Sequence, residues 1–151
     1  MDASATQAAI AALNRIMESE LAGVVKYTHH ALMVYGYNRI PIVSWLQGNA
    51  RESLGHAHRA GELVTLLGGQ PSLKIGTLLE SGQHDIGGIL RESLAHEQAA
   101  LALYHGLLQI AQGQSVLLEE YARDLIVIED MHLDEVHKML RRPGEVSATP
   151  G

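Results

Sequence analysis

Apolar residues recur in four stretches of this chain at alternating spacings of three and four, and this periodicity restricts the fold more than any other feature. Such spacing places side chains on one face of an α-helix. In the first stretch the shared face carries Ile10, Leu13, Met17, Val24 and Tyr27. Helices with one apolar face bury it by packing against each other. We therefore expect an all-α fold, a four-helix bundle.

The expected helices cover residues 6–38, 41–67, 85–112 and 116–140, and the first is capped by Ser4 or Thr6. Pro41 separates the first two helices, and the run Gly68-Gly69-Gln70-Pro71 ends the second. Periodicity is lost over residues 71–83, which predicts one long crossover between the second and third helices, because parallel neighbours need a connection as long as the bundle. We assign residues 1–141 to the bundle and 142–151 to a disordered tail.

Length and composition fit one compact domain with a mainly aliphatic core. The chain has 151 residues, of which 46% are hydrophobic and 4% aromatic, and it contains no Phe. Leu, Ile, Val, Ala and Met must therefore fill the interior, which suits closely packed helices. The net charge of −6 comes without a run of Lys or Arg, so we expect no nucleic-acid partner.

The chain also lacks sequence signals for secretion and for membrane insertion. Its first residues contain no basic segment followed by a sustained apolar stretch, and no segment approaches the ~20 apolar residues that span a bilayer. We expect a soluble, cytoplasmic protein with no membrane partner. Because cysteine is absent while histidine occurs nine times, any bound metal must be held by His, Asp or Glu.

Each apolar helix face is interrupted near its middle by a residue that can bind a metal. These interruptions are Glu20, His56, Glu97, and the pair Glu129 and His132. Unpaired buried carboxylates are costly, so a packed bundle that contains several of them needs a counter-charge. Two divalent cations would supply it. The spacing Glu129-x-x-His132 also places both side chains on one helix face, within reach of one ion.

The second helix departs from the pattern of known di-iron bundles, in which two helices give one Glu each and the other two give Glu-x-x-His. Three residues before His56 stands Ser53, and Glu52 stands four residues before it. At ~100° per residue Glu52 and His56 are still about 40° apart around the helix. We predict Glu52 as the sixth ligand; if Ser53 faced the metal instead, the site would lack one carboxylate. The predicted ligands, which are also the catalytic residues, are Glu20, Glu52, His56, Glu97, Glu129 and His132.

Nearly the whole chain, to Arg141, resembles the bacterioferritin branch of the ferritin-like superfamily. The segments that carry the resemblance are Leu13-Asn14-Arg15, Ser19-Glu20-Leu21, His56-Ala57-His58-Arg59, Gly69-Gln70-Pro71, Leu90-Arg91-Glu92-Ser93-Leu94-Ala95-His96-Glu97 and Glu129-x-x-His132. The resemblance implies a ferroxidase that oxidises Fe(II) with O₂ or peroxide at a centre of two iron ions per chain. It also implies iron storage or detoxification and a homo-oligomer, built from dimers and often closed into a 24-subunit shell.

The sequence departs from that family at two places. The family's haem is held by a methionine two residues before the second-helix histidine, where this chain has Leu54, so haem is not expected. The family's short fifth helix has no counterpart in residues 142–151, so the sequence does not decide whether a 24-subunit shell forms. Tyr27, seven residues after Glu20, could either hydrogen-bond a ligand near the centre or serve as an ordinary core tyrosine.

Three other functions fit part of the pattern. A di-iron oxidase or peroxidase would use the same ligands without storing iron, and would need a cavity wider than O₂ beside the metals. A DNA-protecting mini-ferritin would need a basic tail, and this tail offers Arg141 and Arg142. A metal-free interaction module would need salt bridges to neutralise Glu20, Glu97 and Glu129.

Overall fold

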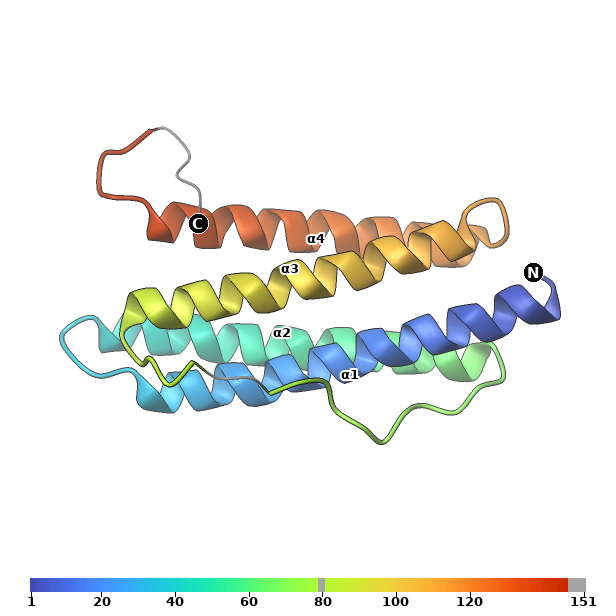
Figure 1. Cartoon of the computed structure of the whole chain (residues 1–151), viewed down its shortest axis with the longest axis horizontal. Coiled ribbons are helices and arrows are strands. Elements are labelled where there is room, and N and C mark those ends of the chain that lie inside the picture. The colour runs from blue at the N-terminus through green and yellow to red at the C-terminus, as the bar shows by residue number, and fades with distance from the viewer. Residues whose placement is uncertain (79–80, 147–151) are drawn as a thin grey trace.

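A computed structural model describes residues 1–78 and 81–146 of the chain. It contains four long helices that run side by side, α1 (Ala3–Met33), α2 (Arg39–Leu66), α3 (Ile86–Ala111) and α4 (Val116–Leu140) (Figure 1). No strand occurs among the described residues. α1 packs against both α2 and α3, and α3 packs against α4. The predicted all-α four-helix bundle is therefore confirmed.

The predicted helix ends differ from the observed ones by a few residues, for local reasons. α1 begins at Ala3 because the Asp2 side chain, not Ser4 or Thr6, accepts the Ala5 N–H at 2.7 Å. It ends at Met33, not at residue 38, since Gly36 takes a φ of 100° and starts a turn. α2 begins at Arg39, which places Pro41 in the first helical turn, where a missing N–H costs no hydrogen bond.

The long connection between α2 and α3 runs along α1 (Figure 1), which confirms the predicted crossover. It starts with Gly68 at a φ of 84°, the left-handed residue that ends α2. The Asn14 side chain then holds it by donating to the Gln70 carbonyl at 3.1 Å and accepting the Ser72 N–H at 2.8 Å. Gly76 donates its N–H to the Glu18 carbonyl at 2.8 Å, and a Cβ there would lie 3.1 Å from the same oxygen. A Cβ at position 76 would therefore crowd the backbone of α1, so glycine lets the crossover lie close to that helix.

Apolar side chains fill the bundle on both sides of a polar layer. One large cluster joins residues such as Leu13, Ile16, Leu107 and Leu118 from the half of the bundle that contains the N-terminus. Two smaller clusters occupy the opposite half. Each fully buried Leu or Ile stabilises the fold by about 1.5–3 kcal/mol. The polar layer between these clusters is therefore held in place by packing on either side.

After α4 the chain makes a turn in which the Arg142 N–H donates to Glu145 Oε2 at 3.1 Å. The predicted tail begins here, and its residues 147–151 lie outside the described part, so its disorder stays a prediction. No helix among the described residues is long and apolar enough to cross a membrane.

Candidate metal centre

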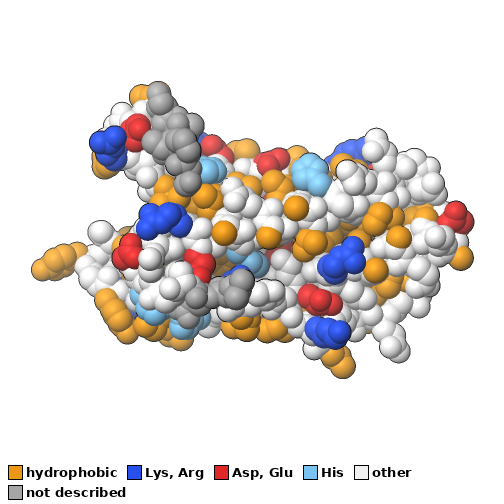
Figure 2. Space-filling view, viewed as in Figure 1, with side chains coloured by type: hydrophobic (Ala, Val, Ile, Leu, Met, Phe, Trp, Pro, Cys, Tyr) orange, Lys and Arg blue, Asp and Glu red, His pale blue; other side chains and the backbone are white. Residues whose placement is uncertain are grey.

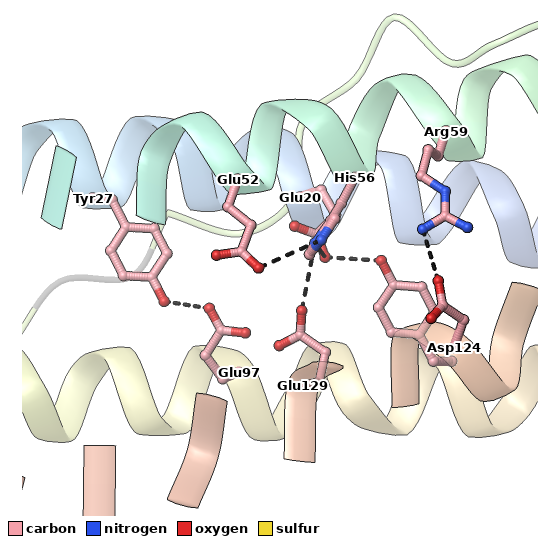
Figure 3. Close-up of polar contacts among 9 residues, drawn as sticks. Glu20, Tyr27, Glu52, His56, Arg59, Glu97, Asp124 and Glu129 are labelled. Atoms are coloured by element: carbon pink, nitrogen blue, oxygen red, sulfur yellow. Dashed lines mark hydrogen bonds and ion pairs between the residues drawn. The ribbon is translucent and has the colours of Figure 1, made fainter. Parts of the chain in front are cut away.

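Each of the four helices places at least one acidic or histidine side chain in the polar layer. Glu20 of α1, His56 of α2, Glu97 of α3 and Glu129 of α4 expose between 3% and 9% of their surface. In Figure 3 they point toward one another across the bundle interior. Burial of three carboxylates is costly unless something compensates their charge, so their convergence makes this layer the candidate functional centre.

Three of these residues form a geometry suitable for one metal ion. His56 Nδ1 lies 3.6 Å from Glu20 Oε1 and 3.5 Å from Glu129 Oε1. One ligand atom from each of the three residues lies within 4.8 Å of the others. Ligand atoms that are each about 2.1 Å from a metal are separated by about 3–4 Å. The set Glu20, His56 and Glu129 therefore fits a divalent cation with little rearrangement.

A second set of candidate ligands adjoins the first on the side of Tyr27. The carboxyl groups of Glu97 and Glu129 are close enough to shift each other's pKa, so Glu129 lies between the two sets. Glu97, Glu129 and His132 border a small cavity of about 10 Å³, which is close to the space of one water molecule. Of these residues, His132 shows the clearest sign of a missing partner. Its Nε2 is buried and has no hydrogen-bond partner in the described structure. Trp45 stacks on its ring at a centroid distance of 5.8 Å, which fixes the imidazole plane.

The sequence left open whether Glu52 or Ser53 of α2 faces the centre, and both side chains lie beside it. Ser53 is buried and Glu52 is 48% exposed at its side chain, yet both border the cavity. Glu52 Oε1 lies 3.8 Å from His56 Nε2, on the opposite side of the imidazole ring from Glu20 and Glu129, which face Nδ1. Glu52 also borders an open groove of about 540 Å³ between α2 and α4. Thus Ser53 occupies the inner wall, and Glu52 stands at the edge of the site.

Two tyrosines support the carboxylates in a reciprocal way. Tyr27 of α1 donates its hydroxyl hydrogen to Glu97 Oε1 of α3. Tyr104 of α3 donates to Glu20 Oε1 of α1 at 2.9 Å. Each tyrosine stands seven residues after the glutamate of its own helix. Tyr27 is therefore both a buried core tyrosine and a hydrogen-bond donor to a predicted ligand, so it meets both descriptions that its spacing allowed.

Burial and mutual repulsion set the protonation of the carboxylates. Burial, and then the hydrogen bond to Glu97, raise the pKa of Glu129 to about 11. Burial by itself would also raise the pKa of Glu97, but hydrogen bonds from Glu129 and Tyr27 and the nearby His132 outweigh it and lower that pKa. The pair therefore shares one proton at neutral pH. A cation that displaces this proton would stabilise both carboxylates.

Burial and neighbouring charges also shift the pKa values of Glu20 and His56. Burial raises the pKa of Glu20, although His56 partly opposes this effect. Burial disfavours the charged form of His56, yet the hydrogen bond and charge of Glu20 prevail and raise its pKa. Among the described residues, no Lys or Arg forms an ion pair with Glu20, Glu97 or Glu129.

Sequence reasoning missed three residues that surround the centre. Tyr104 could have been found, because its spacing from Glu97 repeats that of Tyr27 from Glu20. Trp45 and Asn49 were not identified as neighbours of the site, since their proximity to His132 and to the cavity depends on how α2 and α4 are placed relative to each other.

A four-helix bundle with a carboxylate and histidine cluster between its helices has the architecture of the di-iron carboxylate proteins. The sequence agrees with this class: residues 10–143 match the ferritin-like domain family. The chain belongs to the ferritin-like domain family, in agreement with the resemblance to its bacterioferritin branch.

Solved structures with the same fold cover nearly the whole chain. A ferritin-like di-iron carboxylate protein from Bacillus anthracis has a TM-score of 0.86 and 22% identity, over 93% of this chain and 100% of that one. The bacterioferritin of Rhodobacter capsulatus has a TM-score of 0.79 and 24% identity, over 93% and 85%. A dodecameric thioferritin from Bacteroides fragilis has a TM-score of 0.82 and 20% identity, over 89% and 85%. No curated protein sequence matches the chain.

Proposed function

We propose that this protein is a ferroxidase, which binds two Fe(II) ions per chain inside the bundle and oxidises them with O₂ or peroxide, for iron storage or detoxification. One ion would be held by Glu20 and His56, the other by Glu97 and His132, and Glu129 would contact both. Glu52, the sixth predicted ligand, stands at the edge of the cavity and would have to turn inward to join this set. Side chains of this type, together with two metal ions ~3.5–4 Å apart, form a two-metal site.

The convergence of three buried carboxylates and two histidines without a basic partner is the observation that carries this proposal. Two divalent ions bring four positive charges, which would offset the buried carboxylates and remove the cost of their desolvation. The same observation weighs against a metal-free interaction module, since that hypothesis needs salt bridges to Lys or Arg. Among the described residues Glu20 and Glu129 pair with His56, and Glu97 accepts a hydrogen bond from Tyr27.

The chemistry balances with the oxidants named. Each Fe(II) gives up one electron, and O₂ takes two electrons and two protons to become hydrogen peroxide. Where peroxide is the oxidant, it takes two electrons and two protons and becomes two water molecules. The tyrosine hydroxyls would keep Glu97 and Glu20 oriented toward the ions, and the apolar clusters on both sides would limit the access of water.

The small cavity favours iron over an organic substrate. Its volume of about 10 Å³ is close to that of one water molecule, so it admits O₂ or a small inorganic ion but not an organic substrate. An oxidase acting on an organic substrate would need a wider cavity. A DNA-protecting mini-ferritin is also disfavoured: on the face shown in Figure 2, Lys and Arg are scattered among acidic side chains and form no continuous basic patch.

We further propose a homo-oligomer with a dimer as its unit. α1 and α2 share an open groove of about 410 Å³ whose lining includes the exposed Leu32 and Leu54. A second subunit would cover these apolar side chains. The groove lining contains no Met, His or Cys, so it offers no usual axial ligand and haem is not expected there. Light scattering would distinguish a dimer, a dodecamer and a 24-subunit shell.

Anaerobic titration with Fe(II), followed by admission of air, tests the function. We expect two irons bound per chain and a rapid rise of ferric absorbance, both lost in Glu97→Ala and kept in the control Glu62→Ala, which removes an exposed carboxylate of α2. Iron accepted beyond two per chain would support storage. If the unmodified protein bound no iron, or if Glu97→Ala behaved like the control, the proposal would be wrong.

A further inference from the structure

Asn49 has a buried side-chain amide whose nitrogen forms no hydrogen bond with the rest of the described protein. It lies on α2 and is 7% exposed, and its amide nitrogen Nδ2 is buried without a hydrogen-bond partner in the described structure. A buried donor left unsatisfied is destabilising. Asn49 also borders the cavity that Glu97, Glu129 and His132 enclose. A hydrogen-bond acceptor that enters this cavity could satisfy the amide.

The second half of the bundle indicates that the fold itself does not require a polar residue here. Asn49 stands seven residues before His56, and Leu125 stands seven residues before His132. Leu125 is fully buried and belongs to the large apolar cluster. Since the equivalent position accepts leucine, the amide of Asn49 is better explained by a ligand than by packing.

The charges of the centre indicate what kind of ligand this is. Glu20, Glu97 and Glu129 supply three negative charges when ionised, because Ser53 stands where a fourth carboxylate would complete the inner wall. Two divalent ions supply four positive charges, so one positive charge is left when Glu52 stays at the edge. A small anion would neutralise it. An N–H group in the wall suits an anion, whereas it would repel a third cation.

We propose that Asn49 donates a hydrogen bond from Nδ2 to a small anion, hydroxide in the absence of others, which the cavity holds beside the two metal ions. This inference rests on the proposed two-metal site and assigns a positioning role to Asn49. The anion fits the size of the cavity, which is close to that of one water molecule.

Azide binding to the Co(II)-loaded protein tests the role of Asn49 without relying on activity. We expect the unmodified protein and Asn49→Leu to bind two Co(II) ions each, and the azide dissociation constant of the variant to be at least about tenfold higher, because a hydrogen bond to a charged group is lost. Visible absorbance of Co(II) reports both steps. Ser93→Ala is the matched control: it removes another buried, unpartnered polar group, which does not border the cavity, and should leave azide affinity unchanged.

The possible results separate this inference from the proposed function. Equal azide affinity in the unmodified protein and Asn49→Leu would overturn the role of Asn49 while the metal site stands. Loss of one Co(II) ion in Asn49→Leu would also overturn it, because Asn49 would then be a metal ligand. Fewer than two Co(II) ions in the unmodified protein would refute the two-metal site itself. Asn49→Ala, which adds no bulk, repeats the test if the leucine variant fails to fold.

Discussion

The helix pairs α1–α2 and α3–α4 repeat the same residues at the same spacings around the centre. Glu20 and Tyr27 of α1 correspond to Glu97 and Tyr104 of α3, and each tyrosine bonds the glutamate of the other helix. His56 of α2 corresponds to His132 of α4. The interior of the bundle thus has an approximate two-fold arrangement, which would hold two ions in similar surroundings.

The two pairs differ on the faces of α2 and α4 that precede these histidines. Three residues before the histidine, α2 has Ser53 where α4 has Glu129, and seven residues before it, α2 has Asn49 where α4 has Leu125. One half therefore supplies a buried carboxylate and an apolar wall, while the other supplies neutral polar groups. The two halves of the centre are unequal for this reason, and under the proposed function Glu129 would be the inner carboxylate that contacts both ions.

The largest expected effect comes from removing Glu129. Glu129→Ala should weaken the binding of both ions by about a hundredfold or more, since losing a shared ligand exceeds the 10–100-fold typical of outer-shell changes. Its counterpart Ser53→Ala should change affinity by less than about threefold. Equilibrium dialysis with Co(II) measures both. Similar losses in the two variants would mean that Ser53 is itself a ligand and that the two halves are more alike than their sequences.

A substitution that makes the two halves alike should destabilise the metal-free protein. Ser53→Glu adds a fourth carboxylate to the inner wall, where Ser53 already lies close to Gly23. We expect the metal-free variant to unfold with about 2–4 kcal/mol less free energy, because the new charge is buried and unpaired. Two divalent ions should restore most of this loss. Urea denaturation with and without Co(II) is the measurement, and Glu62→Gln, which changes an exposed carboxylate of α2 that does not border the cavity, is the control.

The fold was predictable from the sequence to a greater extent than the centre. Apolar periodicity defined the four helices and the crossover, because packing decides which face is buried. Helix ends were displaced, since they depend on single contacts such as the Asp2 cap and the turn at Gly36. Of the six ligands predicted from the sequence, the structure brings five to the inner layer and leaves Glu52 at its edge. Iron binding by these residues stays a prediction.

Ser53 and Glu52 show why the sequence could not go further. Neighbouring residues on a helix differ by ~100° in direction, and both positions were close enough to the histidine face to qualify. In the structure Ser53 is buried and the Glu52 side chain is 48% exposed, and this difference depends on which face α2 turns to the bundle interior, which no local pattern encodes. The reciprocal tyrosine bonds depend in the same way on the lengthwise placement of α1 relative to α3.

A third difference between the halves should appear as a pH dependence. Glu129 keeps its proton at neutral pH in the metal-free protein, because burial raises its pKa to about 11, whereas Ser53 has no carboxyl proton. A metal must displace this proton, so apparent affinity should rise by up to about tenfold per pH unit between pH 6 and pH 8. Calorimetry in two buffers with different ionisation enthalpies would detect the released proton.

The matched variant Glu129→Gln should release about one proton fewer on metal binding. The same shift affects folding with a defined sign. A carboxyl group whose pKa is higher in the folded than in the unfolded chain holds its proton in the folded state, so its contribution to stability falls as pH rises from its ordinary value of 4.5 toward 11. A metal affinity that did not depend on pH would contradict the conclusion that Glu97 and Glu129 share a proton in the metal-free protein.

The smallest expected effects test where the two halves are alike. Tyr27→Phe leaves Glu97 without its phenol donor, and Tyr104→Phe does the same for Glu20. Each change should lower the free energy of unfolding by about 1–3 kcal/mol when metal is bound, because the carboxylate then lacks a buried partner. Since both tyrosines are almost fully buried, the two losses should agree within about 0.5 kcal/mol, measured by thermal unfolding of the Co(II)-loaded variants. A much larger loss for Tyr27→Phe would show that the Glu97 side of the centre depends more on its tyrosine, and the resemblance between the halves would then be limited to geometry.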